Sequence, residues 1–147
     1  MITNEQYKNG VFSSKSDEWE TPQSLFDRLN KIFCFELDVA ASDANHKCEK
    51  YYTKEQNALN LPWGGYRTWC NPPYGRQIAD WVKKASETVE DGESCVVMLI
   101  PARTDTKWFH DYIANNPRAH TVFLKGRLRF GGSKENAPFP SMIVVFA

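Results

Sequence analysis

The sequence predicts an α/β protein whose sheet is mainly parallel, with an antiparallel element at its C-terminal edge. Up to about residue 120, segments with apolar residues at helical spacing alternate with short apolar runs typical of buried strands. Two strand-like segments, 120–124 and 141–146, then follow each other with only a Gly- and Pro-containing connection between them. Strands joined without a helical crossover pair antiparallel, so the parallel order should break at this end of the chain.

Three helices are predicted from apolar spacing. The first covers residues 22–33, with Thr21 as N-cap, Pro22 at the first helical position and one apolar stripe formed by Leu25, Phe26, Leu29, Ile32 and Phe33. The second runs up to Gly92 on the spacing of Ile78, Val82, Ala85 and Val89. The third is expected from a cap near Thr104 to Asn115.

Short apolar runs predict the remaining strands. Residues 35–40, 66–70 and 95–100 each read as a buried strand, and 95–100 is the most apolar run of the chain. The polar stretch 42–61 is expected to hold one short helix and one short strand. A proline pair cannot continue a central strand, so residues 71–75 should form a loop directly after the strand 66–70.

Length and composition bound the remaining possibilities. The chain has 147 residues, 41% of them apolar and 14% aromatic, which suits one domain and is too rich in aromatic residues for a disordered tail. We expect a flexible leader over residues 1–16 and a single domain over 17–147. The first residues contain no apolar signal segment and no long apolar run follows, so a cytoplasmic protein without a membrane span is expected. The four cysteines lie singly, without metal-ligand spacing, and predict no metal site.

Polar residues follow three of the predicted strands. Asp38, Asn71 and Arg103 each lie at or just beyond the end of an apolar run. Ligands of parallel sheets bind beyond the carboxyl ends of the strands, so these three residues should meet on one face. The tetrad Asn71-Pro72-Pro73-Tyr74 is the sharpest signal, because a chance occurrence in a chain of this length is on the order of one in a thousand or rarer.

The tetrad and its surroundings resemble the small phage-type DNA N-6-adenine methyltransferases, which depend on S-adenosylmethionine. The resemblance covers nearly all of residues 19–146 and rests on five segments in order: DEWETP (17–22), LDVAAS (37–42), WCNPPYG (69–75), PARTDT (101–106) and GRLRFGG (126–132). It implies a minimal Rossmann-like class I methyltransferase sheet and a methyl transfer to adenine N6 in DNA.

The chemistry explains the residue types in the tetrad. The lone pair of adenine N6 is delocalised into the ring, so this nitrogen is a poor nucleophile. If the Asn71 side-chain oxygen and the Pro72 carbonyl accept its two hydrogens, the lone pair points outward and can take a methyl group by direct in-line displacement. The rigidity of Pro72 and Pro73 matters because a displacement of about 1 Å can cost on the order of a hundredfold in rate. Tyr74 would stack on a base flipped out of the duplex.

The resemblance also implies cofactor residues. Thr21 would help hold the methionine carboxylate at a helix N-terminus, Asp38 would orient the methionine amino group, and Ala40 together with Asn71 would line the same site. The segment after Asp38 lacks the glycines usual in methyltransferases. Three acids are open as the ribose ligand (Asp43, Glu49 and Glu55), and Asn57 or Trp63 is a candidate for the adenine pocket.

Target binding must come from the catalytic domain itself, because no stretch is long enough for a separate target-recognition domain. Residues 101–147 carry seven basic and three acidic side chains, although the whole chain has a net charge of zero. The candidate substrate-binding residues are Trp19, Arg103, Lys107, Arg127 and Phe130. Lys125, Arg129 and Lys134 are further candidates for phosphate contacts, and Trp108 for supporting the flipped base.

Two other functions stay open. The same loop chemistry suits glutamine in a protein or an amino base in RNA. An inactive nucleic-acid-binding module is also conceivable, although such a module has no use for acceptors placed around an amino group. Oligomeric state, monomer or homodimer, is left open.

Overall fold

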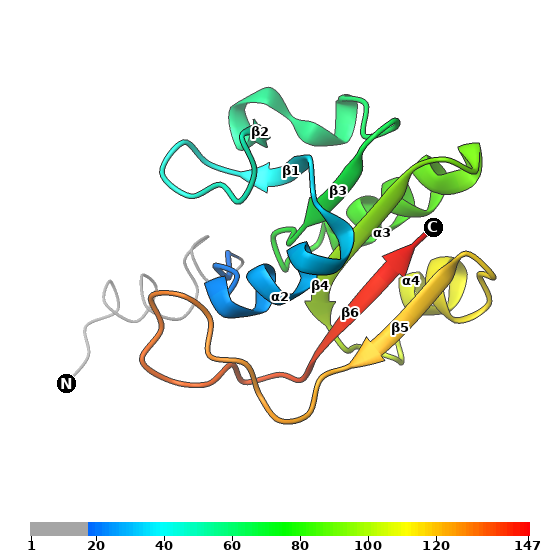
Figure 1. Cartoon of the computed structure of the whole chain (residues 1–147). Helices are drawn as coiled ribbons and strands as arrows, with labels where there is room; N and C mark the ends of the chain where they lie inside the picture. Colours follow the sequence, from blue (N-terminus) through cyan, green and yellow to red (C-terminus); the bar gives the residue numbers. More distant parts are fainter. Residues whose placement is uncertain (1–17) are drawn as a thin grey trace.

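A six-stranded sheet forms the centre of the computed structural model, which describes residues 18–147 (Figure 1). The strand order is β2-β1-β3-β4-β6-β5, and the strands are β1 (Leu37–Ala41), β2 (Lys50–Thr53), β3 (Arg67–Cys70), β4 (Cys95–Pro101), β5 (Ala119–Phe123) and β6 (Ser141–Phe146). The predicted Rossmann-like α/β class is confirmed. The expected leader over residues 1–16 lies outside the described residues.

The antiparallel element at the C-terminal edge of the sheet is confirmed, with β6 on its inner side and β5 as the edge strand. β1, β2, β3 and β4 are mutually parallel, whereas β6 inserts antiparallel between β4 and β5. β6 reads MIVVF almost without a polar residue, and five of its six residues are buried. Such a strand is stabilised most by pairing on both sides, so the more exposed β5 takes the edge.

The helices begin later than the capping signals predict. α2 spans Gln23–Phe33 and its N-cap position is Pro22, whose carbonyl accepts from Leu25 and Phe26 (both 3.1 Å). The Thr21 side chain makes no capping hydrogen bond to the helix, because its hydroxyl accepts from another part of the chain. α3 spans Ile78–Thr88 and ends in a 3-10 turn, Val89–Asp91.

The third helix is shorter and less regular than predicted. α4 covers only Lys107–Phe109 and continues as a π-helical turn, His110–Ala114. Its cap is Thr106, two residues beyond the predicted Thr104, and the Thr106 hydroxyl accepts from the Phe109 amide at 3.3 Å. The polar stretch 42–61 holds β2 and two 3-10 turns, η3 (Lys54–Gln56) and η4 (Ala58–Asn60).

Two apolar layers cover the faces of the sheet. Val96, Met98 and Ile100 of β4 point to the layer shared with α3 and α4, whereas Val97 and Leu99 point to the layer shared with α2. This alternation is the two-residue period of a strand that is buried on both faces. In Figure 1, α2 accordingly lies on one side of the sheet and α3 and α4 on the other.

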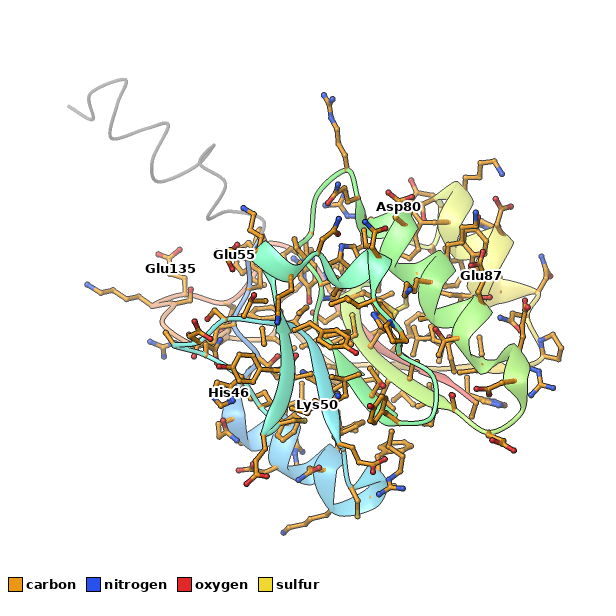
Figure 2. The ribbon with its side chains drawn as sticks, turned by 90° about the horizontal axis from the view of Figure 1, so that it is seen from above. His46, Lys50, Glu55, Asp80, Glu87 and Glu135 are labelled. Atoms are coloured by element: carbon orange, nitrogen blue, oxygen red, sulfur yellow. The ribbon has the colours of Figure 1, made fainter. Side chains whose placement is uncertain are left out.

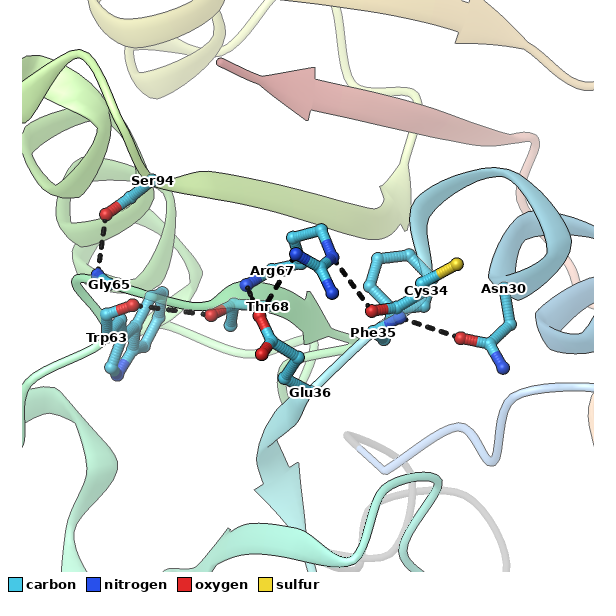
Figure 3. A network of polar contacts seen from close by, with 9 residues as sticks. All are labelled: Asn30, Cys34, Phe35, Glu36, Trp63, Gly65, Arg67, Thr68 and Ser94. Atoms are coloured by element: carbon cyan, nitrogen blue, oxygen red, sulfur yellow. Dashed lines mark hydrogen bonds and ion pairs between the residues drawn. The ribbon is translucent and has the colours of Figure 1, made fainter.

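A hydrogen-bond network lies at the amino ends of β1 and β3 (Figure 3). The Arg67 Nε donates to the Cys34 carbonyl and the Arg67 amide donates to Glu36 Oε1, both at 3.0 Å. Cys34 adopts the left-handed conformation (φ 52°) that ends α2. These contacts set the register between β1 and β3, so that their carboxyl ends lie together at the other edge.

Among residues 18–147, no helix has the length and apolar character needed to cross a membrane.

Candidate active site

The loop Asn71–Gly75 lies between β3 and α3, at the carboxyl end of the central strands. Asn71 follows the last residue of β3, and two prolines stop the strand because they cannot donate to a β-ladder. Pro72 is buried, while Asn71 and Tyr74 are half-buried. The expected placement of the tetrad in a loop after a strand is confirmed.

The Asn71 carboxamide is oriented by the segment that precedes α2. Its Nδ2 donates to the Trp19 carbonyl and, at 2.9 Å, to the Thr21 hydroxyl. A backbone carbonyl can only accept, so the NH₂ group must face Trp19 and the Asn71 Oδ1 must face the other way. The Thr21 hydroxyl is used in this contact, and Thr21 is only 5% exposed.

Tyr74 holds the other side of the same amide. Its hydroxyl lies 2.7 Å from Asn71 Oδ1 and 2.9 Å from the Leu99 carbonyl of β4. Burial raises the pKa of the Tyr74 phenol well above its ordinary value, so the hydroxyl stays protonated and acts as a donor. The ring meets Phe139 edge-on at 5.6 Å between centroids. Stacking of Tyr74 on a target base stays a prediction.

An aromatic cluster supports the loop from the side of α2. Trp19 packs edge-on against Phe130 (5.4 Å) and Phe139 (5.1 Å). Phe130 is only 2% exposed and packs against Trp19 and Tyr74. Its ring therefore presents no free face to a ligand, in contrast to its predicted role in substrate binding. Phe139 was not predicted, because only its contacts in the folded chain connect it to the tetrad.

A backbone bridge joins the two segments that carry this cluster. The Gly131 amide donates to the Glu20 carbonyl at 2.8 Å. A Cβ at Gly131 would lie 3.0 Å from the Glu20 side chain, so the close approach favours glycine there. Residues 111 positions apart in the sequence thus form one wall of the site.

Asp38 lies inside β1 and is 3% exposed. Its Oδ1 accepts from the Ala40 amide (3.2 Å) and its Oδ2 from the Lys47 amide (2.9 Å). Burial raises the Asp38 pKa, and the two amide hydrogen bonds oppose that rise. Lys47 Nζ also donates to Gln23 Oε1 of α2 at 2.7 Å, so the chain after β1 bridges Asp38 and the start of α2.

An acidic cavity of about 350 Å³ lies beyond the carboxyl end of β2. It is lined by Asp43, Tyr51, Thr53, Glu55 and Gln56. The Tyr51 hydroxyl donates to Asp43 Oδ1 at 2.7 Å. Glu49 precedes β2, whose first residue is Lys50, whereas Glu55 lies in the turn after the strand; Lys50 and Glu55 are labelled in Figure 2. Of the three acids left open by the sequence, only Asp43 and Glu55 line this cavity.

The two candidates for an adenine pocket differ in exposure. Trp63 is 1% exposed, and its Nε1 donates to the Ala58 carbonyl at 3.0 Å, so it belongs to the core and the suggestion of Trp63 as an adenine-pocket residue is wrong. Asn57 is exposed next to the acidic cavity, in the left-handed conformation (φ 55°) between the two 3-10 turns.

A second cavity, of about 260 Å³, adjoins the tetrad on the side of β4. Its lining consists of Tyr74, Gly75, Arg76, Ile78, Pro101, Arg103, Thr106 and Trp108. Arg103 follows β4 and Asn71 follows β3 as expected, so these two residues lie at the carboxyl ends of neighbouring parallel strands. The expectation that Asp38 follows its strand is wrong, because β1 begins at Leu37 and Asp38 pairs in register with Trp69 inside β3. Arg76 was missed, although it comes directly after the tetrad and its glycine.

The other predicted cationic residues lie further out. Lys107 is exposed and its Nζ donates to Asp111 one helical turn away, a contact that raises the Lys107 pKa. Arg127 is exposed on the connection between β5 and β6, and Arg129 donates from Nε to the Ser133 carbonyl at 3.1 Å.

Comparison with known proteins agrees with this geometry. A sequence model of the family described as DNA N-6-adenine-methyltransferase (Dam) matches residues 8–146. A DNA N-6-adenine-methyltransferase of Haemophilus phage HP1 (strain HP1c1) is 31% identical over 146 residues, covering 95% of this chain and 83% of the relative. One of Escherichia phage T1 is 41% identical over 114 residues, covering 76% of this chain and 46% of that longer protein. The chain therefore belongs to the DNA N-6-adenine-methyltransferase (Dam) family.

Proposed function

We propose that this protein transfers a methyl group from S-adenosylmethionine to N6 of adenine in DNA, on a base flipped out of its stack. The single observation that carries the proposal is the Asn71 carboxamide, whose orientation is fixed by Trp19 on one side and Tyr74 on the other. Family membership supports the reaction class, because the phage relatives bear the name of this activity.

Asn71 and Pro72 would act as the paired acceptors. The Asn71 Oδ1 has two lone pairs and accepts one hydrogen bond, from Tyr74, so one lone pair is left for a substrate hydrogen. Within residues 18–147, no hydrogen bond is donated to the Pro72 carbonyl. Two acceptors on adjacent residues can bind both hydrogens of one amino group and turn its lone pair outward. The single hydroxyl hydrogen of Tyr74 is shared between Asn71 Oδ1 and the Leu99 carbonyl, and this contact keeps the first acceptor in place.

The acidic side of the site suits a cationic methyl donor. S-adenosylmethionine supplies an electrophilic methyl group on a positively charged sulfur. Asp38 is a buried carboxylate beside this region, and Asp43 and Glu55 offer acceptors for the ribose hydroxyls in the cavity beyond β2. The start of α2 would face the methionine carboxylate, with Thr21 and Ala40 as close backbone neighbours. Desolvation of Asp38 is offset best when a cation is bound near it.

The decisive experiment identifies the product. Unmethylated DNA is incubated with the protein and methyl-labelled S-adenosylmethionine, the DNA is digested to nucleosides, and the labelled nucleoside is identified. We expect labelled N6-methyldeoxyadenosine. Parallel reactions with RNA and with a glutamine-containing peptide test the other amino acceptors, and label found only there would overturn adenine in DNA as the substrate.

The paired-acceptor role is tested by Asn71→Ala. Loss of one positioned polar group at a reacting centre costs about a hundred- to a thousandfold in kcat, and we expect a loss of that size. Asn60→Ala is the matched control, because Asn60 is exposed in η4 and lies outside the site. An Asn71→Ala protein with the melting temperature and the kcat of the wild type would contradict the mechanism even if the activity exists.

A further inference from the structure

Arg76 and Arg103 reach one small cavity from two different loops. Arg76 follows the catalytic loop after β3, and Arg103 lies in the turn after β4. Both are exposed at its mouth. The parallel pairing of β3 and β4 places these two loops side by side at the carboxyl edge of the sheet. Two positive charges therefore converge although 27 positions separate them in the sequence.

Both guanidinium groups are free of acidic partners in the part of the chain that the structure describes. The ion pairs found there are Arg67–Glu36, Lys83–Glu87 and Lys107–Asp111. Asp105, the acid nearest to Arg103 in the sequence, forms none of them. A guanidinium presents five N–H donors in a planar fork that matches phosphate oxygens, so two unpaired forks around one cavity form an anion-binding arrangement.

The inner part of the cavity is apolar. Ile78 and Trp108 are each 8% exposed, and Pro101, the last residue of β4, is buried. An inorganic anion gains little from such a surface, whereas a nucleotide combines an anionic phosphate with an apolar base. The volume of about 260 Å³ is also below the range of about 300–1,000 Å³ typical of larger ligands, which suits part of a polymer.

The position of the cavity relates it to the reaction. Tyr74 and Gly75 line it, and Tyr74 also holds the Asn71 acceptor. We propose that this cavity binds the nucleotide next to the target adenine in the DNA strand, with Arg76 and Arg103 on its phosphate and its base over the Ile78–Trp108 surface. The inference rests on the proposed function, because it assumes that DNA is the substrate. It gives Arg76 a binding role and describes how the residues around the loop 71–75 would hold DNA.

The experiment measures DNA affinity as a function of salt. Fluorescence anisotropy with a labelled, adenine-containing oligonucleotide gives Kd at several salt concentrations for wild type, Arg76→Gln, Arg103→Gln and the double variant. We expect each single variant to weaken binding about tenfold at low salt and to reduce the slope of log K against log salt by about one. Arg118→Gln is the matched control, because Arg118 lies at the amino end of β5, whereas the cavity lies at the carboxyl ends of β3 and β4. This variant should leave the slope unchanged.

Two further measurements keep this test separate from that of the proposed function. Affinity for S-adenosylmethionine should stay within twofold in every variant, and the KM for DNA should rise while kcat at saturating DNA is retained. Any of four results would overturn the inference. The folded double variant keeps the wild-type salt slope, or Arg118→Gln loses as much DNA affinity as the other variants. Alternatively, the variants lose affinity for S-adenosylmethionine, or the wild type binds no DNA. If the wild type forms no methylated adenine but the arginine variants lose DNA affinity, the proposed function fails and the nucleotide site stands.

Discussion

The two cavities at the carboxyl edge of the sheet differ in charge. The one beyond β2 is lined by Asp43 and Glu55 and contains no basic residue, whereas the one beyond β4 is lined by Arg76 and Arg103 and contains no acidic residue. The loop Asn71–Gly75, which carries the proposed acceptors, follows β3, and β3 lies between β1 and β4 in the sheet. A formal net charge of zero therefore conceals a site with an acidic side and a basic side.

This separation matches the opposite charges of the two proposed ligands. A sulfonium donor is attracted by acids and DNA by bases, so each ligand would be drawn to its own side and repelled from the other. Parallel strands make such an arrangement simple, because neighbouring strands deliver successive loops to the same edge. Asn71 lies at the boundary and carries no charge itself.

Among substitutions that change a charge, the one at that boundary should have the largest effect. In Asn71→Asp the carboxylate has no hydrogen to donate to the Trp19 carbonyl, so two acceptors would face each other. We expect kcat to fall about a hundredfold. Steady-state methylation of DNA measures it, with Asn60→Asp as the control for added surface charge. Wild-type turnover in Asn71→Asp would show that the Trp19 contact does not orient the amide.

Removing the buried acid should weaken donor binding about tenfold. Asp38→Asn keeps the shape of the side chain but loses the charge, so titration calorimetry should show weaker binding of S-adenosylmethionine and unchanged DNA affinity. Burial raises the Asp38 pKa, so in the wild type donor affinity should fall on acidification at a pH above the ordinary carboxyl range.

The same raised pKa has a consequence for folding. A carboxyl that binds its proton more tightly when folded contributes stability below its unfolded pKa and loses it as the pH rises through the folded value. Thermal melts of the unliganded protein should show this loss in the wild type and not in Asp38→Asn. A pH-independent donor affinity in the wild type would contradict the assignment of Asp38 to the donor side.

Glu55→Gln should weaken donor binding about three- to tenfold, because a carboxylate accepts from ribose hydroxyls more strongly than an amide does. Glu49→Gln is the matched control from the other end of β2. Titration calorimetry measures the affinity of both variants for S-adenosylmethionine. An equal loss of affinity in Glu49→Gln would contradict a specific role of Glu55 in donor binding.

The smallest effects are expected at the outer cations. Arg127→Gln should weaken DNA binding about two- to threefold, because an exposed charge is screened by salt. Lys107→Gln should have less effect still, since Lys107 is already paired with Asp111. Fluorescence anisotropy at low salt gives the Kd for DNA of both variants. A larger loss of DNA affinity in Lys107→Gln than in Arg103→Gln would indicate that DNA binds along α4 and not at the cavity.

The sequence allowed the strands and the loop after β3 to be predicted, because periodicity and proline placement are local signals. It did not reveal that Asp38 lies near the start of β1, because β1 extends to Ala41 and the Asp38 partners are backbone amides. The insertion of β6 between β4 and β5 depends on which strand is stabilised more by pairing on both sides. The local sequence pattern of either strand does not indicate this. The Asn71 side chain donates to the backbone carbonyl of Trp19. Every residue has such a carbonyl, so the sequence does not indicate which one is the partner. The prediction of Thr21 as a helix cap was wrong because its hydroxyl accepts from the Asn71 side chain, 50 residues away in the sequence.

The bridge between Glu20 and Gly131 bears on how the protein is made. Trp19, which orients Asn71, packs against Phe130 and Phe139, and these residues are synthesised only after all the strands except β6. A nascent chain on the ribosome therefore cannot complete its catalytic loop until nearly the entire domain has emerged. Methylation would begin only with the finished protein, so fragments that stop before residue 130 would lack the contacts that hold the amide in place.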